Sequence, residues 1–165
     1  TAPTPAAAAR HPDGARGEAR PRHYAAASAR RRADIEKLEA QPEGLITPEF
    51  LTATVRRHID PDNTILLSEG ITNYTVIANH MRMTQPGSYF ASVGGSLGWN
   101  GGAAIGTKLA APDKTVVALS GDGCYMFSIP SPVHRTAATD ETPFPVPSTP
   151  LTLPTILPPR PHLPR

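Results

Sequence analysis

The chain has 165 residues, enough for one domain, and a formal net charge of +2. It contains 20 Pro and 13 Gly, while 39% of its residues are hydrophobic and 5% aromatic, so we expect part of it not to fold. The single cysteine excludes an intrachain disulfide framework and a multi-cysteine zinc site. No apolar run approaches the roughly 18 residues of a membrane span.

Two segments precede the part that we expect to fold. Residues 1–22 contain no large aliphatic side chain, which predicts a disordered Ala/Arg/Pro arm. Residues 23–41 are rich in strong helix formers and predict a helix or linker with little apolar surface. The basic start resembles a transit peptide in composition, although we favour an interdomain linker. We expect an intracellular protein, cytoplasmic or mitochondrial, and a chain that starts at Thr is consistent with a fragment.

The middle of the chain has the pattern of an α/β domain. Thr47 followed by Pro48 is typical of a helix start. Helices are predicted at 48–59, 72–83 and 103–111, and short buried strands at 64–68, 88–92 and 115–120. This order predicts the fold class α/β, an incomplete open parallel sheet flanked by helices. Such sheets bind ligands at the carboxyl ends of their strands.

The C-terminal part is dense in proline from Pro130 onward and has no recurring apolar face. We therefore expect a disordered, Pro-rich tail over 136–165. A tail without a partner is the simpler interpretation, and a docking site for Pro-reading modules at 158–161 is the alternative. With nothing folded after residue 135, the strand at 115–120 is expected to leave apolar surface uncovered.

Three enzyme fingerprints are absent from the sequence: Gly-x-Gly-x-x-Gly, Gly-x-x-x-x-Gly-Lys and His-Glu-x-x-His. What remains is a predicted buried strand that ends in Gly121-Asp122-Gly123. Asp122 offers the oxygen ligands that Mg²⁺ prefers, and the glycines allow the backbone to approach phosphate oxygens. Amides at the start of the following helix, at Cys124 and Tyr125, could bind those oxygens too. For this tripeptide alone, a plain turn is the alternative.

Two motifs together are more specific. SVGGSLGWNGGAAIGTKLA at 92–110, followed by VVALSGDGCYMFSIPS at 116–131, resembles the cofactor-binding domain of thiamine-diphosphate-dependent enzymes. Within that family it is most similar to acetolactate synthases and benzoylformate decarboxylases. LLSEGITNY at 66–74 resembles the first strand and loop of the same domain. The resemblance covers 42–135, which we expect to be a partial thiamine-diphosphate-binding domain with Mg²⁺ as second cofactor.

The resemblance implies a role for residues in three loops. Asp122 would bind Mg²⁺, the Gly95 carbonyl would accept from the aminopyrimidine ring, and Leu97 would lie under the bend of the cofactor. The other implied cofactor contacts are Thr72, Asn73, Ser96, Gly121, Gly123, Cys124 and Tyr125.

The same resemblance implies that two parts are missing. Relatives have an Asn further along as second Mg²⁺ ligand, but the corresponding window here, 147–152, reads PSTPLT. Relatives take an activating Glu from a separate pyrimidine-binding domain, and Glu69 does not have the position of that residue. We therefore expect no catalysis by this chain alone, and a full-length parent that acts on a 2-oxo acid as a homo-oligomer. The abrupt change to Pro-rich sequence suggests a frameshift, a retained intron or a mispredicted exon.

Two other functions stay open. A non-catalytic interaction chain would use the basic arm and the Pro-rich tail on either side of an incomplete domain. Nucleic-acid binding through the basic stretch 1–32 is less favoured, because Tyr24 is its one aromatic residue and no recognition pattern is present. We expect neither a nucleic-acid partner nor a membrane.

Overall fold

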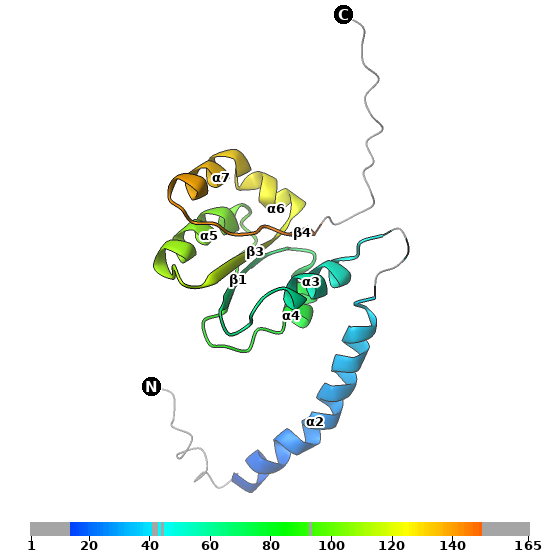
Figure 1. Cartoon of the computed structure of the whole chain (residues 1–165). Helices are drawn as coiled ribbons and strands as arrows, with labels where there is room; N and C mark the ends of the chain where they lie inside the picture. Colours follow the sequence, from blue (N-terminus) through cyan, green and yellow to red (C-terminus); the bar gives the residue numbers. More distant parts are fainter. Residues whose placement is uncertain (1–13, 41–42, 44, 93, 150–165) are drawn as a thin grey trace, which may run out of the picture. The chain divides into compact units, whose positions relative to one another are not determined.

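The computed structural model describes residues 14–40, 43, 45–92 and 94–149 (Figure 1). The chain divides into two compact units, Thr1–Ala40 and Gln41–Arg165. The predictions for residues 1–13 and 150–165 lie outside the described residues. None of the described helices is long and apolar enough to cross a bilayer.

The first unit contains one long helix, α2 (Gly14–Lys37). It begins nine residues before the helix predicted at 23–41, so residues 14–22 are helical and not part of a disordered arm. Five of the nine residues at 14–22 are Ala or Arg, which favour helix even without burial. From Tyr24 onward most side chains of α2 are exposed. The pair formed by Lys37 Nζ and Asp34 Oδ1, 2.8 Å apart, is solvent-exposed and adds little stability.

The second unit is built on a parallel sheet with the strand order β2-β1-β3-β4. Its strands are β1 (Thr64–Glu69), β2 (Tyr89–Ala91), β3 (Thr115–Gly121) and β4 (Ser148–Thr149). The first three confirm the strands predicted from the apolar runs. β1 lies between β2 and β3, with Leu66 opposite both Tyr89 and Val117. The predicted fold class, an open parallel α/β sheet flanked by helices, is thus confirmed.

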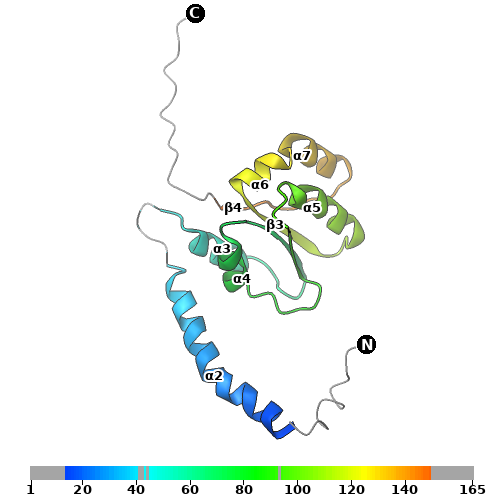
Figure 2. The same ribbon diagram turned by 180° about the vertical axis from the view of Figure 1, so that it is seen from behind.

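Helices lie on both faces of this sheet (Figures 1 and 2). One face carries α3 (Pro48–Arg57) and α4 (Tyr74–Met81). The other carries α5 (Trp99–Ala110) together with α6 (Asp122–Phe127) and α7 (Pro130–Thr139). The predicted start of α3 is confirmed, because the Thr47 side chain accepts a hydrogen bond from the Phe50 amide at 3.2 Å.

The core consists of two layers, because side chains of a strand alternate between the faces of the sheet. Leu66, Val117 and Leu119 face α3 and α4 and pack against Ile77 and Met81. On the other face the buried residues are Leu67, Ala104, Val116 and Ala118. Burial on both faces is what the continuous apolar runs of a parallel sheet require.

The segment after residue 135 differs from the expected tail. Residues 136–139 complete α7, and Phe144 and Val146 pack against the second core layer. The chain then runs along β3, where the Ala118 amide donates to the Pro145 carbonyl at 3.1 Å. β3 is therefore buried over residues 116–121 and does not leave its apolar surface uncovered.

Proline explains why the fourth strand is so short. The carbonyls of Pro145 and Pro147 accept hydrogen bonds from the amides of Ala118 and Ser120. Proline has no N–H, so at these two positions the segment accepts hydrogen bonds without donating any. Regular pairing is confined to Ser148–Thr149, opposite Ser120 and Gly121. Residues 144–149 therefore cover the edge of the sheet, although their Pro-rich composition predicted no structure.

Replacing Phe144 with Ala tests whether this segment supports the fold. Because the ring is half-buried against the sheet, we expect the free energy of unfolding in urea to fall by about 2 kcal/mol. Leu109→Ala is the matched control, because Leu109 is 58% exposed on α5. If the free energy of unfolding falls no further in Phe144→Ala than in the control, the packing of Phe144 does not stabilise the fold.

Candidate functional site

Three loops follow the strands at one edge of the sheet. Ser68 of β1 lies opposite Ala91 of β2, and Glu69 lies opposite Ser120 of β3. The loops at 70–73 and 92–98, and the junction at 121–123 where β3 ends and α6 begins, therefore all lie at the carboxyl edge, where open α/β sheets bind ligands. All the residues that the sequence analysis predicts as cofactor contacts belong to these loops or to the helices that begin there.

The first loop holds Thr72 and Asn73. Thr72 is exposed, whereas Asn73 is buried with 7% of its surface accessible. Asn73 is the N-cap of α4, and its carbonyl accepts from the Ile77 amide at 2.8 Å. Thr72 is thus open to a ligand, while Asn73 serves the start of a helix.

The second loop is shaped by glycine. Gly94 and Gly95 have φ of +84° and +71°, and an added Cβ at either position would meet no atom within 4 Å. Space therefore lies beside this backbone. Ser96 is exposed and its carbonyl accepts from the Ser92 hydroxyl at 3.2 Å. Leu97 is 40% exposed, an apolar side chain presented at a polar edge.

The third loop carries the Gly-Asp-Gly motif at the end of β3. Gly121 is buried, and Asp122 and Gly123 are exposed. Asp122 is the first residue of α6, where a negative charge is favourable. Its Oδ1 accepts from the Gly123 amide at 2.8 Å. That amide, expected to bind phosphate, is thus occupied by the motif's own carboxylate.

Cys124 and Tyr125 both interact with residues of neighbouring segments. Burial raises the pKa of the Cys124 thiol above its ordinary value, and the Glu69 carboxylate raises it further, against backbone hydrogen bonds with Ile71 and Gly121. A raised pKa keeps the thiol protonated at neutral pH and does not favour a nucleophile. The Tyr125 hydroxyl lies 3.0 Å from His134 Nε2.

The donor set at this edge suits Mg²⁺ only together with a phosphate ligand. Among the residues that the structure describes, no group of three or more His, Cys, Asp and Glu could hold a metal ion. Mg²⁺ is commonly held by one or two carboxylates, with substrate phosphates and water as the other ligands. Asp122 fits that pattern. The backbone of β4 places Thr149 opposite Gly121, within the window where the resemblance expects an Asn.

Glu69 is the residue that sequence reasoning missed. It ends β1, and 1% of its surface is exposed. Its Oε1 accepts from the Trp99 amide at 2.9 Å and its Oε2 from the Asn100 amide at 2.8 Å. The signal in the sequence was an acidic residue at the end of a buried strand, together with a helix that has no capping side chain at Gly98.

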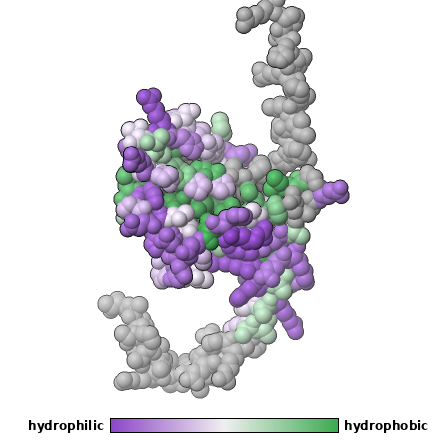
Figure 3. Space-filling model, in the orientation of Figure 1, coloured by the Kyte–Doolittle hydropathy of each residue, from purple (hydrophilic) through white to green (hydrophobic). Residues whose placement is uncertain are grey.

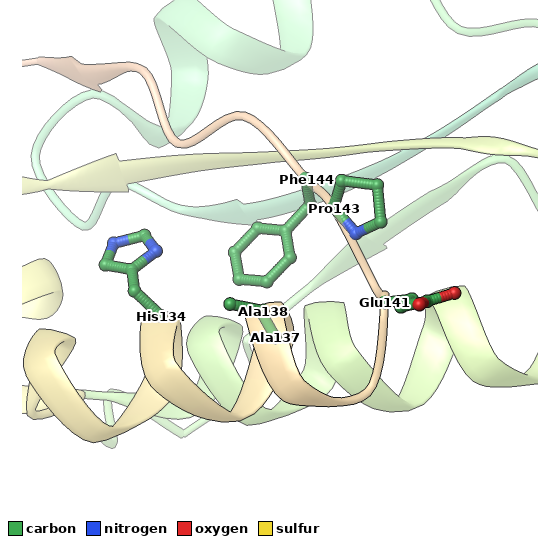
Figure 4. A pocket seen from close by; sticks show the side chains of 6 residues that line it. All are labelled: His134, Ala137, Ala138, Glu141, Pro143 and Phe144. Carbon is green, nitrogen blue, oxygen red and sulfur yellow. The ribbon is translucent and has the colours of Figure 1, made fainter.

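A separate cavity of about 520 Å³ lies between α7 and the segment that follows it. Figure 4 shows His134 on α7 and Phe144 on the extended segment across from it. The two rings are stacked with centroids 6.1 Å apart. The other lining residues are Ala137, Ala138, Glu141 and Pro143. None of the predicted cofactor contacts lines this cavity.

Residues 70–142 match the family described as "Thiamine pyrophosphate enzyme, C-terminal TPP binding domain". The chain is 32% identical over 92 residues to the acetolactate synthase large subunit of Corynebacterium glutamicum, covering 54% of this chain and 14% of that protein. It is 31% identical over 90 residues to the benzoylformate decarboxylase of Pseudomonas aeruginosa, covering 54% of this chain and 17% of that protein.

A solved structure of a putative thiamin diphosphate-dependent enzyme from Mycobacterium smegmatis is also similar. It aligns with a TM-score of 0.59 at 26% identity, covering 68% of this chain and 22% of that one. The sequence match includes all three loops at the carboxyl edge and α7. Residues 70–142 therefore correspond to the C-terminal TPP-binding domain of the thiamine pyrophosphate enzymes, and the chain is related to acetolactate synthase and benzoylformate decarboxylase over about half of its length.

Proposed function

We propose that this chain binds thiamine diphosphate with Mg²⁺ at the carboxyl edge of its sheet. One observation carries the proposal: the parallel register brings the Gly-rich loop and the Gly-Asp-Gly motif to the same edge of one sheet. The open space beside Gly94 and Gly95 and the exposed carboxylate of Asp122 support it, since both are accessible to a ligand.

Each loop then has a distinct task. Asp122 holds Mg²⁺, which neutralises the diphosphate, and Gly123 leaves room for phosphate because an added Cβ there meets nothing within 4 Å. The Gly95 carbonyl orients the aminopyrimidine, and Leu97 supports the bend of the cofactor. The cofactor, when bound, supplies an electron sink for the cleavage of a bond next to a carbonyl. The chain's own residues bind and orient it.

We further propose that the chain supplies only the diphosphate half of an active site that acts on 2-oxo acids. The chain spans 14% and 17% of the two relatives described above. The family resemblance implies that the activating Glu belongs to another domain. Large apolar side chains are exposed on the segments around the carboxyl edge, as a surface covered by a partner would require. They are Ile71, Phe90, Leu97, Trp99, Met126, Phe127 and Ile129. On the face of this unit seen in Figure 3, green apolar surface lies open between purple hydrophilic areas.

Calorimetric titration with thiamine diphosphate and Mg²⁺ tests the binding proposal. We expect saturable binding that requires Mg²⁺, and a Kd raised at least about tenfold in Asp122→Ala, because the carboxylate is the protein's ligand to the metal. Asp113→Ala is the matched control, since Asp113 is an exposed acid that precedes β3 at the opposite edge. Equal affinity in the two variants would contradict the role of Asp122.

The chain alone should not turn over a 2-oxo acid, even when it binds the cofactor. Carbon dioxide release from benzoylformate and from pyruvate would be measured with saturating thiamine diphosphate and Mg²⁺. We expect a rate equal to that of the cofactor in buffer, because the activating Glu is proposed to belong to another domain and the assay contains these 165 residues alone. Release that depends on the chain and disappears in Asp122→Ala would refute the half-site proposal.

A further inference from the structure

Glu69 is a buried carboxylate that the proposed cofactor contacts do not include. It stands at the end of β1, directly before the first loop, with 1% of its surface exposed. Each of its two carboxylate oxygens accepts one backbone hydrogen bond, from Trp99 at 2.9 Å and from Asn100 at 2.8 Å. These amides belong to the first turn of α5, 30 residues further along the chain.

The energetics of this contact favour a fixed geometry. A buried carboxylate is costly unless hydrogen bonds replace the water it has lost. The first amides of a helix have no partners within the helix, and the helix dipole favours a negative charge beside them. Because Gly98, the N-cap of α5, has no side chain, Glu69 supplies from another strand the cap that α5 lacks. If Glu69 or the first turn of α5 moves, the carboxylate loses its two hydrogen-bond donors and the two amides lose their acceptor.

The same turn of α5 is held from its other side. Gly98 has φ of +86°, and a Cβ there would lie 2.8 Å from the Phe127 carbonyl oxygen at the end of α6. At Gly101 a Cβ would lie 3.1 Å from the Val133 side chain of α7. The start of α5 is thus clamped between Glu69 and the helices that follow the Gly-Asp-Gly motif.

We propose that Glu69 is a positioning residue that fixes the Gly94–Gly98 loop for cofactor binding, an inference that rests on the proposed function. The loop has one end in the sheet after β2 and the other at Gly98, so clamping the first turn of α5 fixes its second end. Because Glu69 already occupies the amides of Trp99 and Asn100, the start of α5 is closed to phosphate. The diphosphate then lies on the side of Asp122, and the Gly-rich loop contacts the cofactor through its carbonyls and Leu97.

Glu69→Gln is the direct test, because it keeps the shape of the side chain and replaces one acceptor by an NH₂ group facing an amide. Glu49→Gln is the matched control, since it removes the same charge from the first turn of α3, which has no bond to the loop. The ligand-free readouts are amide hydrogen exchange at Trp99 and Asn100 and the emission of Trp99, the single tryptophan of the chain. The ligand readout is the Kd for thiamine diphosphate with Mg²⁺.

We expect Glu69→Gln to speed exchange of the two amides about tenfold, to shift Trp99 emission and to raise the Kd about tenfold. Exchange in β1 and β3 should stay as in Glu49→Gln. Unchanged exchange at Trp99 and Asn100 would overturn the clamp. If exchange at Trp99 and Asn100 is faster but the Kd for thiamine diphosphate is unchanged, Glu69 caps α5 without a role in cofactor binding, which would overturn the proposal. If the wild type binds no cofactor, the proposed function fails, and the exchange data alone decide whether Glu69 fixes the loop.

A second variant keeps the proposal testable if Glu69→Gln does not fold. Gly98→Ala displaces the same turn from the side of α6, because its Cβ meets the Phe127 carbonyl and its φ is unfavourable for Ala. Gly102→Ala is its control, since Gly102 lies on the same helix and an added Cβ meets no atom within 4 Å. We expect about tenfold weaker binding for Gly98→Ala alone. Equal binding by both variants would contradict the clamp.

Discussion

The parallel register of β1 between β2 and β3 is the constraint on which the rest of this structure depends. It places Ser68 opposite both Ala91 and Leu119 at the carboxyl edge, so that the connections after three strands far apart in the sequence begin together. A shift by one residue would exchange the two faces of β1 and bury the wrong side chains. The same pairing that buries the core therefore also assembles the site, and it brings Glu69 to the first turn of α5.

The sheet depends equally on a segment whose composition argues against structure. A parallel sheet needs cover on both faces, and Phe144 and Val146 complete that cover where α5 and α7 leave space. Pro145 and Pro147 accept hydrogen bonds from β3 without donating any, which suits a strand at an edge. This arrangement brings Thr149 beside Gly121, next to the metal-binding residue that we propose.

The sequence predicted much of this fold and the location of the site. Apolar runs and the Thr47-Pro48 start identified three strands and α3 because local patterns determine these elements. It did not predict β4, because prolines hide a segment whose order comes from contacts with β3. It also missed Glu69, because a cap supplied from another strand depends on tertiary contact. The helical start of α2 was missed because a low apolar content was read as disorder, although Ala and Arg favour helix.

Backbone amide chemical shifts of the ¹⁵N-labelled chain, recorded as thiamine diphosphate and Mg²⁺ are added, would locate the ligand residue by residue. We predict changes concentrated at 71–73, 94–98 and 121–125, with smaller changes at Trp99 and Asn100 through their contact with Glu69. Saturable changes confined to α7 and Phe144, at the separate cavity, would contradict this prediction. So would a folded chain whose spectrum does not change at saturating cofactor.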